Sequence, residues 1–191
     1  GPGDDWLPPD NFQESPALGV AHRTSPTNMG LALLANLSAY DFGYIPAGRL
    51  VDRTRLAFQA MSSLERHRGH FHNWYDTQSL APLEPRYISS VDSGNLAGHL
   101  LTLRPGLLAL PDDPILPPRT FEGLSDTFAL AVEASGNAPA TAVARLRTVL
   151  DTARASPPAT TVAGRLVLDE IARESRALAA ALASTVDPEA G

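Results

Sequence analysis

The chain has 191 residues, a net charge of −6 and no cysteine, and all of its 15 cationic side chains are arginine. The acidic balance and the scattered arginines argue against nucleic-acid binding, and the missing cysteine excludes disulfides, thiolate catalysis and cysteine-ligated metals. No apolar run approaches the ~20 residues that cross a bilayer, so we expect a soluble segment that does not insert into a membrane.

The N-terminal third predicts an irregular segment followed by two helices. Residues 5–24 are interrupted by three prolines and should be irregular. Ser25 has the chemistry of an N-cap and Pro26 suits the first helical position, so a helix should run from there to Gly43. A second helix should follow Pro46 and close at Gly69, with its apolar side formed by Leu50, Thr54, Ala57, Met61 and Leu64.

Residues 70–90 predict a long loop that binds a ligand. They lack helical periodicity, and loops of this length in compact domains are uncommon unless they bind something or are disordered. Their aromatic content argues against disorder. Strand signals are weak throughout the chain, and residues 86–91 form the best short run of that kind.

This loop and the residues after it concentrate aromatic, acidic and amide side chains. Trp74 and Tyr75 offer flat apolar faces, while Asp76, Asp92 and Asn95 offer hydrogen-bond partners for hydroxyl groups. That mixture suits a carbohydrate, whose C–H groups stack on aromatic rings and whose hydroxyls need partners when water is displaced. The structural alternative is that the two rings fill a core and Asp92 only caps a helix.

Four further helices should follow the loop. The first should begin with Asp92 as its cap, place Asp92, Asn95 and His99 on one face, and be kinked or split by Pro105. The others are expected at about 119–134, 140–154 and 160–184, and we expect them to contribute to the fold without carrying site residues. We therefore predict an all-α protein of helical hairpins with long irregular loops, resembling part of an (α/α) toroid.

The expected domain organisation follows from these elements. Residues 1–3 have the composition of a cloning remnant, residues 4–186 would form a single helical domain or a fragment of a larger toroid, and residues 187–191 would form a tail. His67, His70 and His72 suggest a metal site, but a glycine and a helix end interrupt their spacing, so we expect no metal. No nucleotide-binding motif occurs, and no cofactor is expected.

Six segments, taken together, resemble the cyclic β-1,2-glucan synthases: WLPPDNFQE at 6–14, AHRTSPTN at 21–28, AYDFG at 39–43, LER at 64–66, NWYDT at 73–77 and VDSGNLA at 91–97. Members of that family are large bacterial membrane proteins with a glycosyltransferase module, a transglycosylase-like middle module and a phosphorylase-like C-terminal module. This chain resembles the start of the middle module. The resemblance implies a location at the cytoplasmic face of the inner membrane and contacts with the other modules.

The resemblance also implies that the chain helps to close linear β-1,2-glucan into a ring. Retaining transglycosylation needs two carboxyl groups about 5–5.5 Å apart. Asp76 and Asp92 are a tempting pair, but the family resemblance implies that the catalytic carboxylates lie downstream, so no catalytic residue is expected in this chain. Instead, glucan subsites are predicted in which Trp74 or Tyr75 stacks on glucose, Asp76, Asp92 and Asn95 hold hydroxyls, and Arg23 and Asn28 order the facing loop.

Two alternatives remain open at this point. The chain could be a non-catalytic helical scaffold or docking domain between catalytic modules, with its polar loop satisfied internally. In addition, a toroid fragment would expose apolar helix faces where the missing hairpins pack, and those faces would permit a dimer.

Overall fold

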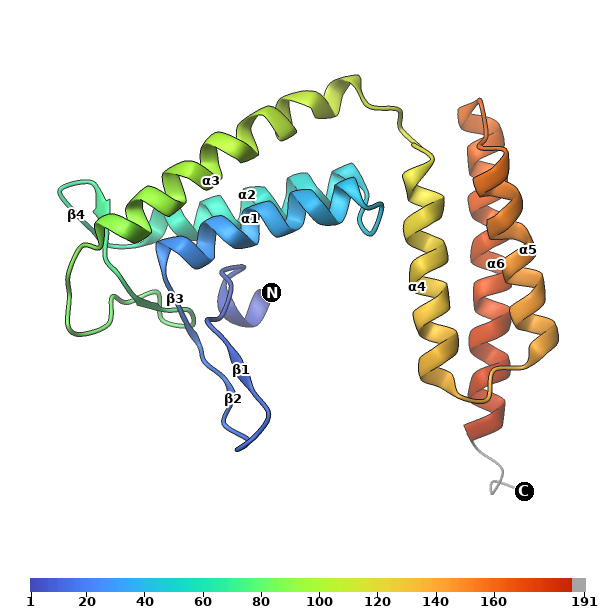
Figure 1. The fold of residues 1–191 in the computed structure, drawn as a ribbon, viewed down its shortest axis with the longest axis horizontal. Helices are drawn as coiled ribbons and strands as arrows, with labels where there is room; N and C mark the ends of the chain where they lie inside the picture. Colours follow the sequence, from blue (N-terminus) through green and yellow to red (C-terminus); the bar gives the residue numbers. More distant parts are fainter. Residues whose placement is uncertain (187–191) are drawn as a thin grey trace. The chain divides into compact units, whose positions relative to one another are not determined.

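The computed structural model describes residues 1–186, which are mostly helical, with six α-helices and three short antiparallel strand pairs (Figure 1). The predicted all-α class is therefore confirmed. The predicted tail at 187–191 lies outside the described residues. Two compact units can be distinguished: unit 1 comprises Gly1–Tyr40 and Pro46–Asp112, and unit 2 comprises Asp41–Ile45 and the residues from Asp113 onward. The assignment of 4–186 to one domain or to a toroid fragment stays a prediction.

Unit 1 contains α1 (Pro26–Asp41) except for its last residue, together with α2 (Ala47–Ser63) and α3 (Ser90–Ala109). It also contains the short 3-10 turns η1 (Pro2–Asp4) and η2 (Leu110–Asp112). α1 begins as predicted, because the backbone N–H of Asn28 donates to Ser25 Oγ over 3.3 Å and Pro26 occupies the first turn. α2 follows Pro46, also as predicted. The capping chemistry of α1 and the position of Pro46 were thus sufficient to locate both starts.

Four details of the elements in unit 1 differ from the predictions. α2 ends at Ser63 rather than at Gly69, and Gly69, with φ of 87°, forms the turn of a strand pair instead. α3 begins at Ser90, because Ser89 Oγ accepts the Asp92 N–H over 3.1 Å and is the N-cap in place of Asp92. Residues 86–91 therefore form no strand, and α3 runs through Pro105 without a break.

The strands are only two residues long, and each pair is antiparallel. β1 (Phe12–Gln13) pairs with β2 (Gly19–Val20), β4 (Arg66–His67) pairs with β5 (His70–Phe71), and β3 (Arg23–Thr24) pairs with β6 (Tyr75–Asp76). The first two pairs are local hairpins. The third pair is not local, because it joins the segment before α1 to the loop between α2 and α3.

The core of unit 1 lies between its three helices and the loop that contains β6. Its buried side chains are Leu7, Met29, Leu33, Ala57, Ala60, Met61, Leu64, Tyr75, Leu96 and Leu103. α1 and α3 approach closely at Gly30, where an added Cβ would lie 2.9 Å from the Cβ of His99. Glycine at this position therefore sets how near the two helices can pack.

Unit 2 contains a three-helix arrangement of α4 (Arg119–Ser135), α5 (Ala140–Ala155) and α6 (Thr161–Val186). Successive helices run in opposite directions, and α5 packs against both α4 and α6 (Figure 1). Their positions confirm the three predicted helices to within about two residues. The buried core consists of Phe121, Leu146, Leu150, Ala153, Ile171 and Leu178.

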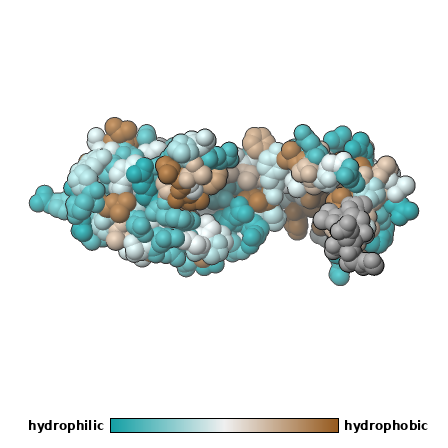
Figure 2. Space-filling view, turned by 90° about the horizontal axis from the view of Figure 1, so that it is seen from below, coloured by the Kyte–Doolittle hydropathy of each residue, from teal (hydrophilic) through white to brown (hydrophobic). Residues whose placement is uncertain are grey.

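The surface is mostly hydrophilic on the face drawn in Figure 2, with separate hydrophobic patches among the polar residues. Within residues 1–186, no helix has both the length and the apolar character needed to span a membrane.

The close approach at Gly30 can be tested with two glycine-to-alanine substitutions in helices. In Gly30→Ala the added methyl meets His99, and such overpacking costs about 1–3 kcal/mol. The gain in helix propensity offsets about 0.5–1 kcal/mol of this cost, so the free energy of unfolding should fall by about 0–2.5 kcal/mol. The control is Gly98→Ala in α3, where a new Cβ meets nothing within 4 Å, and this variant should be stabilised by about 0.5–1 kcal/mol. Urea denaturation that gives equal values for the two variants would contradict the described packing.

Candidate functional site

The β3–β6 pair brings two predicted site residues together, because Arg23 is the register partner of Asp76. The neighbouring partners, Thr24 and Tyr75, are both fully buried. Thr77 extends the connection beyond the ladder, since its backbone N–H donates to the His22 carbonyl over 3.0 Å. The ladder therefore turns the Thr24 and Tyr75 side chains inward and leaves Arg23 and Asp76 nearer the surface.

Arg23 lies at the centre of an ion-paired group. Its Nη2 and Nε donate to Asp10 Oδ2 over 2.9 and 3.1 Å, and the other carboxylate oxygen of Asp10 accepts from Asn28 Nδ2 over 3.0 Å. The Arg23 guanidinium also lies 4.9 Å from the centroid of the Trp74 ring, which is within cation–π range. Arg23, Asn28 and Trp74, all predicted from the sequence, thus belong to one connected group.

Asn73 extends this group toward α3. Its side chain is 5% exposed, and its neighbours require that Nδ2 face Asp92 Oδ2 at 2.9 Å. In that orientation Asn73 Oδ1 accepts from Tyr87 Oη over 2.8 Å and from Trp74 Nε1 over 2.5 Å. Both ends of the Asn73 amide are therefore satisfied, and the amide links the indole to the Asp92 carboxylate.

Asp92 and Asn95 meet at the hydroxyl group of Thr27. Thr27 Oγ1 donates to Asp92 Oδ1 over 2.6 Å and accepts from Asn95 Nδ2 over 3.1 Å. Burial alone would raise the pKa of Asp92, but hydrogen bonds from Ser89 and Thr27 outweigh it, and the pKa lies below its ordinary value. Asp92 is therefore a carboxylate at neutral pH that acts as an acceptor.

Asp76 belongs to a separate set of hydrogen bonds. Its Oδ1 accepts from the backbone N–H groups of Ser79 and Gln78, over 2.7 and 2.9 Å, and from Ser79 Oγ over 3.0 Å. The Ser79 backbone bond is the main reason why the pKa of Asp76 lies below its ordinary value. The carboxylate thus closes the turn after β6, and it does not share the Thr27 group with Asp92.

Tyr75 is a core residue in this structure. Its side chain is fully buried, its hydroxyl donates to the Glu65 carbonyl over 2.7 Å, and it accepts from the His72 N–H over 2.7 Å. Burial raises the pKa of the Tyr75 phenol. Of the two aromatic rings predicted to stack on a sugar, Trp74 is half-buried, whereas Tyr75 has no exposed face.

A pocket of about 460 Å³ opens beside the β3–β6 pair. Arg23 and Asp76 line it together with polar side chains from the β1–β2 hairpin and the residue before β3: Asn11, Gln13 and His22. Leu18, Val20 and Leu83 contribute apolar surface. The volume is within the range of sites that hold small organic ligands, about 300–1,000 Å³, and such sites also combine apolar surface with a few polar groups.

Sequence reasoning did not assign several residues of this region. Asp10, Asn11, Asn73 and Thr27 all lie in the segments on which the family resemblance rests, and this was the available signal. Their roles arise from contacts across the chain that local sequence patterns do not reveal. The pocket also depends on the β1–β2 hairpin, which had been expected only as irregular chain.

The three clustered histidines have different environments. His67 pairs with His70 across the β4–β5 hairpin, while His72 is 8% exposed and its Nε2 lies 3.8 Å from Glu65 Oε1. Within residues 1–186, no group of three or more histidine, aspartate or glutamate side chains is arranged to hold a metal ion.

Comparison with known proteins shows what this chain is similar to in sequence. No family model matches the chain. The chain is 42% identical over 135 residues to the cyclic beta-(1,2)-glucan synthase NdvB of Rhizobium meliloti (strain 1021). The match covers 70% of this chain but only 5% of that protein.

The structural role of the buried Tyr75 hydroxyl can be tested through stability. Tyr75→Phe leaves the His72 N–H and the Glu65 carbonyl without their partner, so the free energy of unfolding should fall by about 1–3 kcal/mol. Tyr44→Phe is the control, because that ring is 53% exposed and its hydroxyl donates to the exposed Asp126 carboxylate, and it should cost less than about 1 kcal/mol. A Tyr75→Phe variant as stable as the parent chain would show that the buried hydroxyl is not structural.

The charge of Asp92 should make unit 1 sensitive to acid. Because its pKa is lowered in the folded chain, the carboxylate stabilises the fold above its ordinary value of 3.8, and this contribution is lost as the pH falls through the lowered value. Asp92→Asn should therefore cost about 1–3 kcal/mol at pH 7 and progressively less below pH 3.8. Asp169→Asn, at an exposed position of α6, should change stability by less than about 0.5 kcal/mol. A difference between the parent chain and Asp92→Asn that stays constant down to pH 2 contradicts this account.

Proposed function

This chain belongs to the cyclic β-1,2-glucan synthase family, and from that premise we propose that it contributes glucan-binding subsites to the module that closes linear β-1,2-glucan into a ring by transglycosylation. The matched segment spans 5% of its relative, so the chain would supply one part of a much longer polypeptide. Its function is then to hold substrate rather than to complete the reaction.

The pocket beside the β3–β6 pair is the observation that carries the proposal. A glucose unit presents several hydroxyl groups, each of which needs a donor or acceptor when water is displaced. Asn11 and Gln13 can act as both donor and acceptor, and Arg23 and Asp76 add one charge of each sign. The apolar side chains of Leu18 and Leu83 would face the C–H groups of the sugar ring.

Trp74 and the Asp92 group would extend this site along the glucan. Arg23 connects them, because it lines the pocket and also lies over the Trp74 ring. The exposed part of the indole would stack on a glucose unit, and Asn95, which is exposed, would hold a hydroxyl beside Asp92. Asn28 has a supporting role, since it holds Asp10 in place against Arg23.

We assign no catalytic step to these residues. Retaining transglycosylation requires two carboxyl groups about 5–5.5 Å apart on either side of one glycosidic bond. Asp76 is engaged with Gln78 and Ser79, and Asp92 is engaged with Thr27, so each carboxylate already serves a local structural purpose. We therefore expect the isolated chain to be catalytically silent.

The scaffold or docking role remains a second candidate because of the same hydrogen bonds. Asp76 and Asp92 accept bonds from their own chain, and Tyr75 is fully buried. A polar loop that is satisfied internally is what a purely structural segment requires. The pocket lined by Asn11 and Gln13 favours glucan binding over this alternative.

Titration with linear and cyclic β-1,2-glucans, followed by Trp74 fluorescence in a Trp6→Phe background, tests the proposal. We expect saturable binding that Gln13→Ala weakens about five- to tenfold, since one hydrogen bond to a ligand contributes about 1 kcal/mol. The matched control is Gln59→Ala on α2, outside the pocket, and it should leave the dissociation constant unchanged.

Two results would count against this function. Binding that is absent for both glucans by fluorescence and by calorimetry favours the scaffold role. Turnover of linear glucan by the 191-residue chain that is lost in Asp76→Asn or Asp92→Asn refutes the assignment of catalysis to the rest of the polypeptide.

A further inference from the structure

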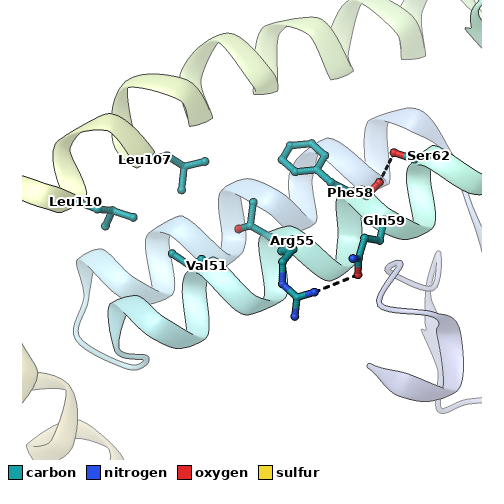
Figure 3. A pocket seen from close by; sticks show the side chains of 8 residues that line it. Val51, Arg55, Phe58, Gln59, Ser62, Leu107 and Leu110 are labelled. Carbon is teal, nitrogen blue, oxygen red and sulfur yellow. Dashed lines mark hydrogen bonds between the residues drawn. The ribbon is translucent and has the colours of Figure 1, made fainter.

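Unit 1 contains a second hollow, whose lining is less polar than that of the pocket beside the β3–β6 pair. It is a groove of about 660 Å³ between α2 and the C-terminal end of α3 (Figure 3). Val51 and Phe58 line it from α2, and Leu107 and Leu110 line it from α3 and η2. Figure 3 shows the Phe58 ring and the Leu107 side chain in the space between the two helices. The lining is predominantly apolar, in contrast to the pocket at Arg23.

The groove follows the axis of α2 for about three turns. Six α2 residues line the groove, and four of them are spaced by four, three and four positions and therefore form a single ridge: Val51, Arg55, Phe58 and Ser62. At a rise of 1.5 Å per residue, this ridge is about 16 Å long. An elongated groove beside a helical ridge matches the packing surface for another helix better than it matches a compact ligand.

Two observations indicate that the groove is incomplete in this chain. Val51 and Phe58 keep 49% and 36% of their surface exposed, which is high for apolar residues that face a neighbouring helix. Thr54 also lines the groove and is 5% exposed, yet its Oγ1 has no hydrogen-bond partner. A buried hydroxyl without a partner costs free energy, so an occupant that supplies a donor or acceptor there would be favoured.

The composition of α3 supports the same conclusion. Its 20 residues include only two charged side chains, Asp92 and Arg104, and its apolar residues are distributed on all sides. Another face of this helix exposes Val91, Leu101 and Leu108 by 70%, 75% and 59%. Helices that are apolar all round are typical of the interior of a larger helical body.

We propose that the groove between α2 and α3 is the docking site of an α-helix from the same polypeptide, outside these 191 residues. The relative extends far beyond the matched segment, which is 5% of its length, so ample polypeptide is available in a protein of this kind. The docking helix would present an apolar face to Phe58 and Leu107, and a polar side chain to Thr54. This inference rests on the family membership and not on glucan binding, so either can fail without the other.

Site-specific photocrosslinking in the full-length polypeptide tests the proposal. Phe58 is replaced by p-benzoylphenylalanine, which keeps an aromatic side chain in the groove, and the crosslinked peptides are identified by mass spectrometry after irradiation. The control carries the same probe in place of Phe12, which is 63% exposed on β1 and does not line the groove. We expect the probe at position 58 to give an intramolecular crosslink to one helical segment outside this chain, and the control not to crosslink to that segment.

Each other result overturns the proposal. A crosslink between two copies would assign the groove to a dimer, and a crosslink to lipid or detergent would assign it to an apolar ligand. Crosslinks confined to the 191 residues would show that a segment of this chain covers the groove, and the same partner peptide at positions 58 and 12 would show that the contact is not specific to the groove.

Discussion

The pairing of β3 with β6 is the contact on which the arrangement of unit 1 depends. It joins Arg23–Thr24, just before α1, to Tyr75–Asp76, in the loop after α2. A two-residue ladder is too short to be stable by itself, and closing the intervening chain costs entropy. The buried side chains of Thr24 and Tyr75 and the hydrogen bonds of the Tyr75 hydroxyl offset that cost. The same contact then determines where Arg23, Trp74 and Asp76 lie.

Polar side chains in this region have structural duties that limit what they can do for a ligand. A sugar hydroxyl that bonds to Asp76 must compete with the N–H groups of Ser79 and Gln78, and one that bonds to Asp92 must compete with Thr27. Net affinity should therefore depend more on Asn11 and Gln13, whose side chains line the pocket without belonging to either carboxylate group. In return, the internal bonds hold Arg23 and Asn73 in defined positions, which reduces the entropy lost on binding.

Unit 1 has two hollows that differ in polarity, the polar pocket beside the β3–β6 pair and the apolar groove between α2 and α3. The polar pocket is formed by short strands and loops, where residues can be substituted without disturbing helix packing. The apolar groove is formed by α2 and α3, whose exposed residues would be costly to leave in water. Substrate contacts and contacts with neighbouring helices would then use separate surfaces, so that a change in one need not affect the other.

The sequence by itself determined the all-α class and the positions of most helices. Ser25 with Pro26, and Pro46, marked the starts of α1 and α2, while apolar periodicity located α4, α5 and α6; these signals act within a few residues. Residue types that suit a sugar also led to the prediction of Trp74, Asp92 and Asn95 as site residues, and the family resemblance added Arg23 and Asn28; their roles in glucan binding stay predictions. Only the tertiary structure decided that Tyr75 is buried, that Ser89 rather than Asp92 caps α3, and that the β1–β2 hairpin completes a pocket. The Ser89 cap and the β1–β2 hairpin are local, but serine and aspartate both suit an N-cap, so residue type alone did not choose between them. The burial of Tyr75 and the environment of Asp92 depend on partners outside their own segments, Glu65 and Thr27, and local periodicity carries no information about those contacts.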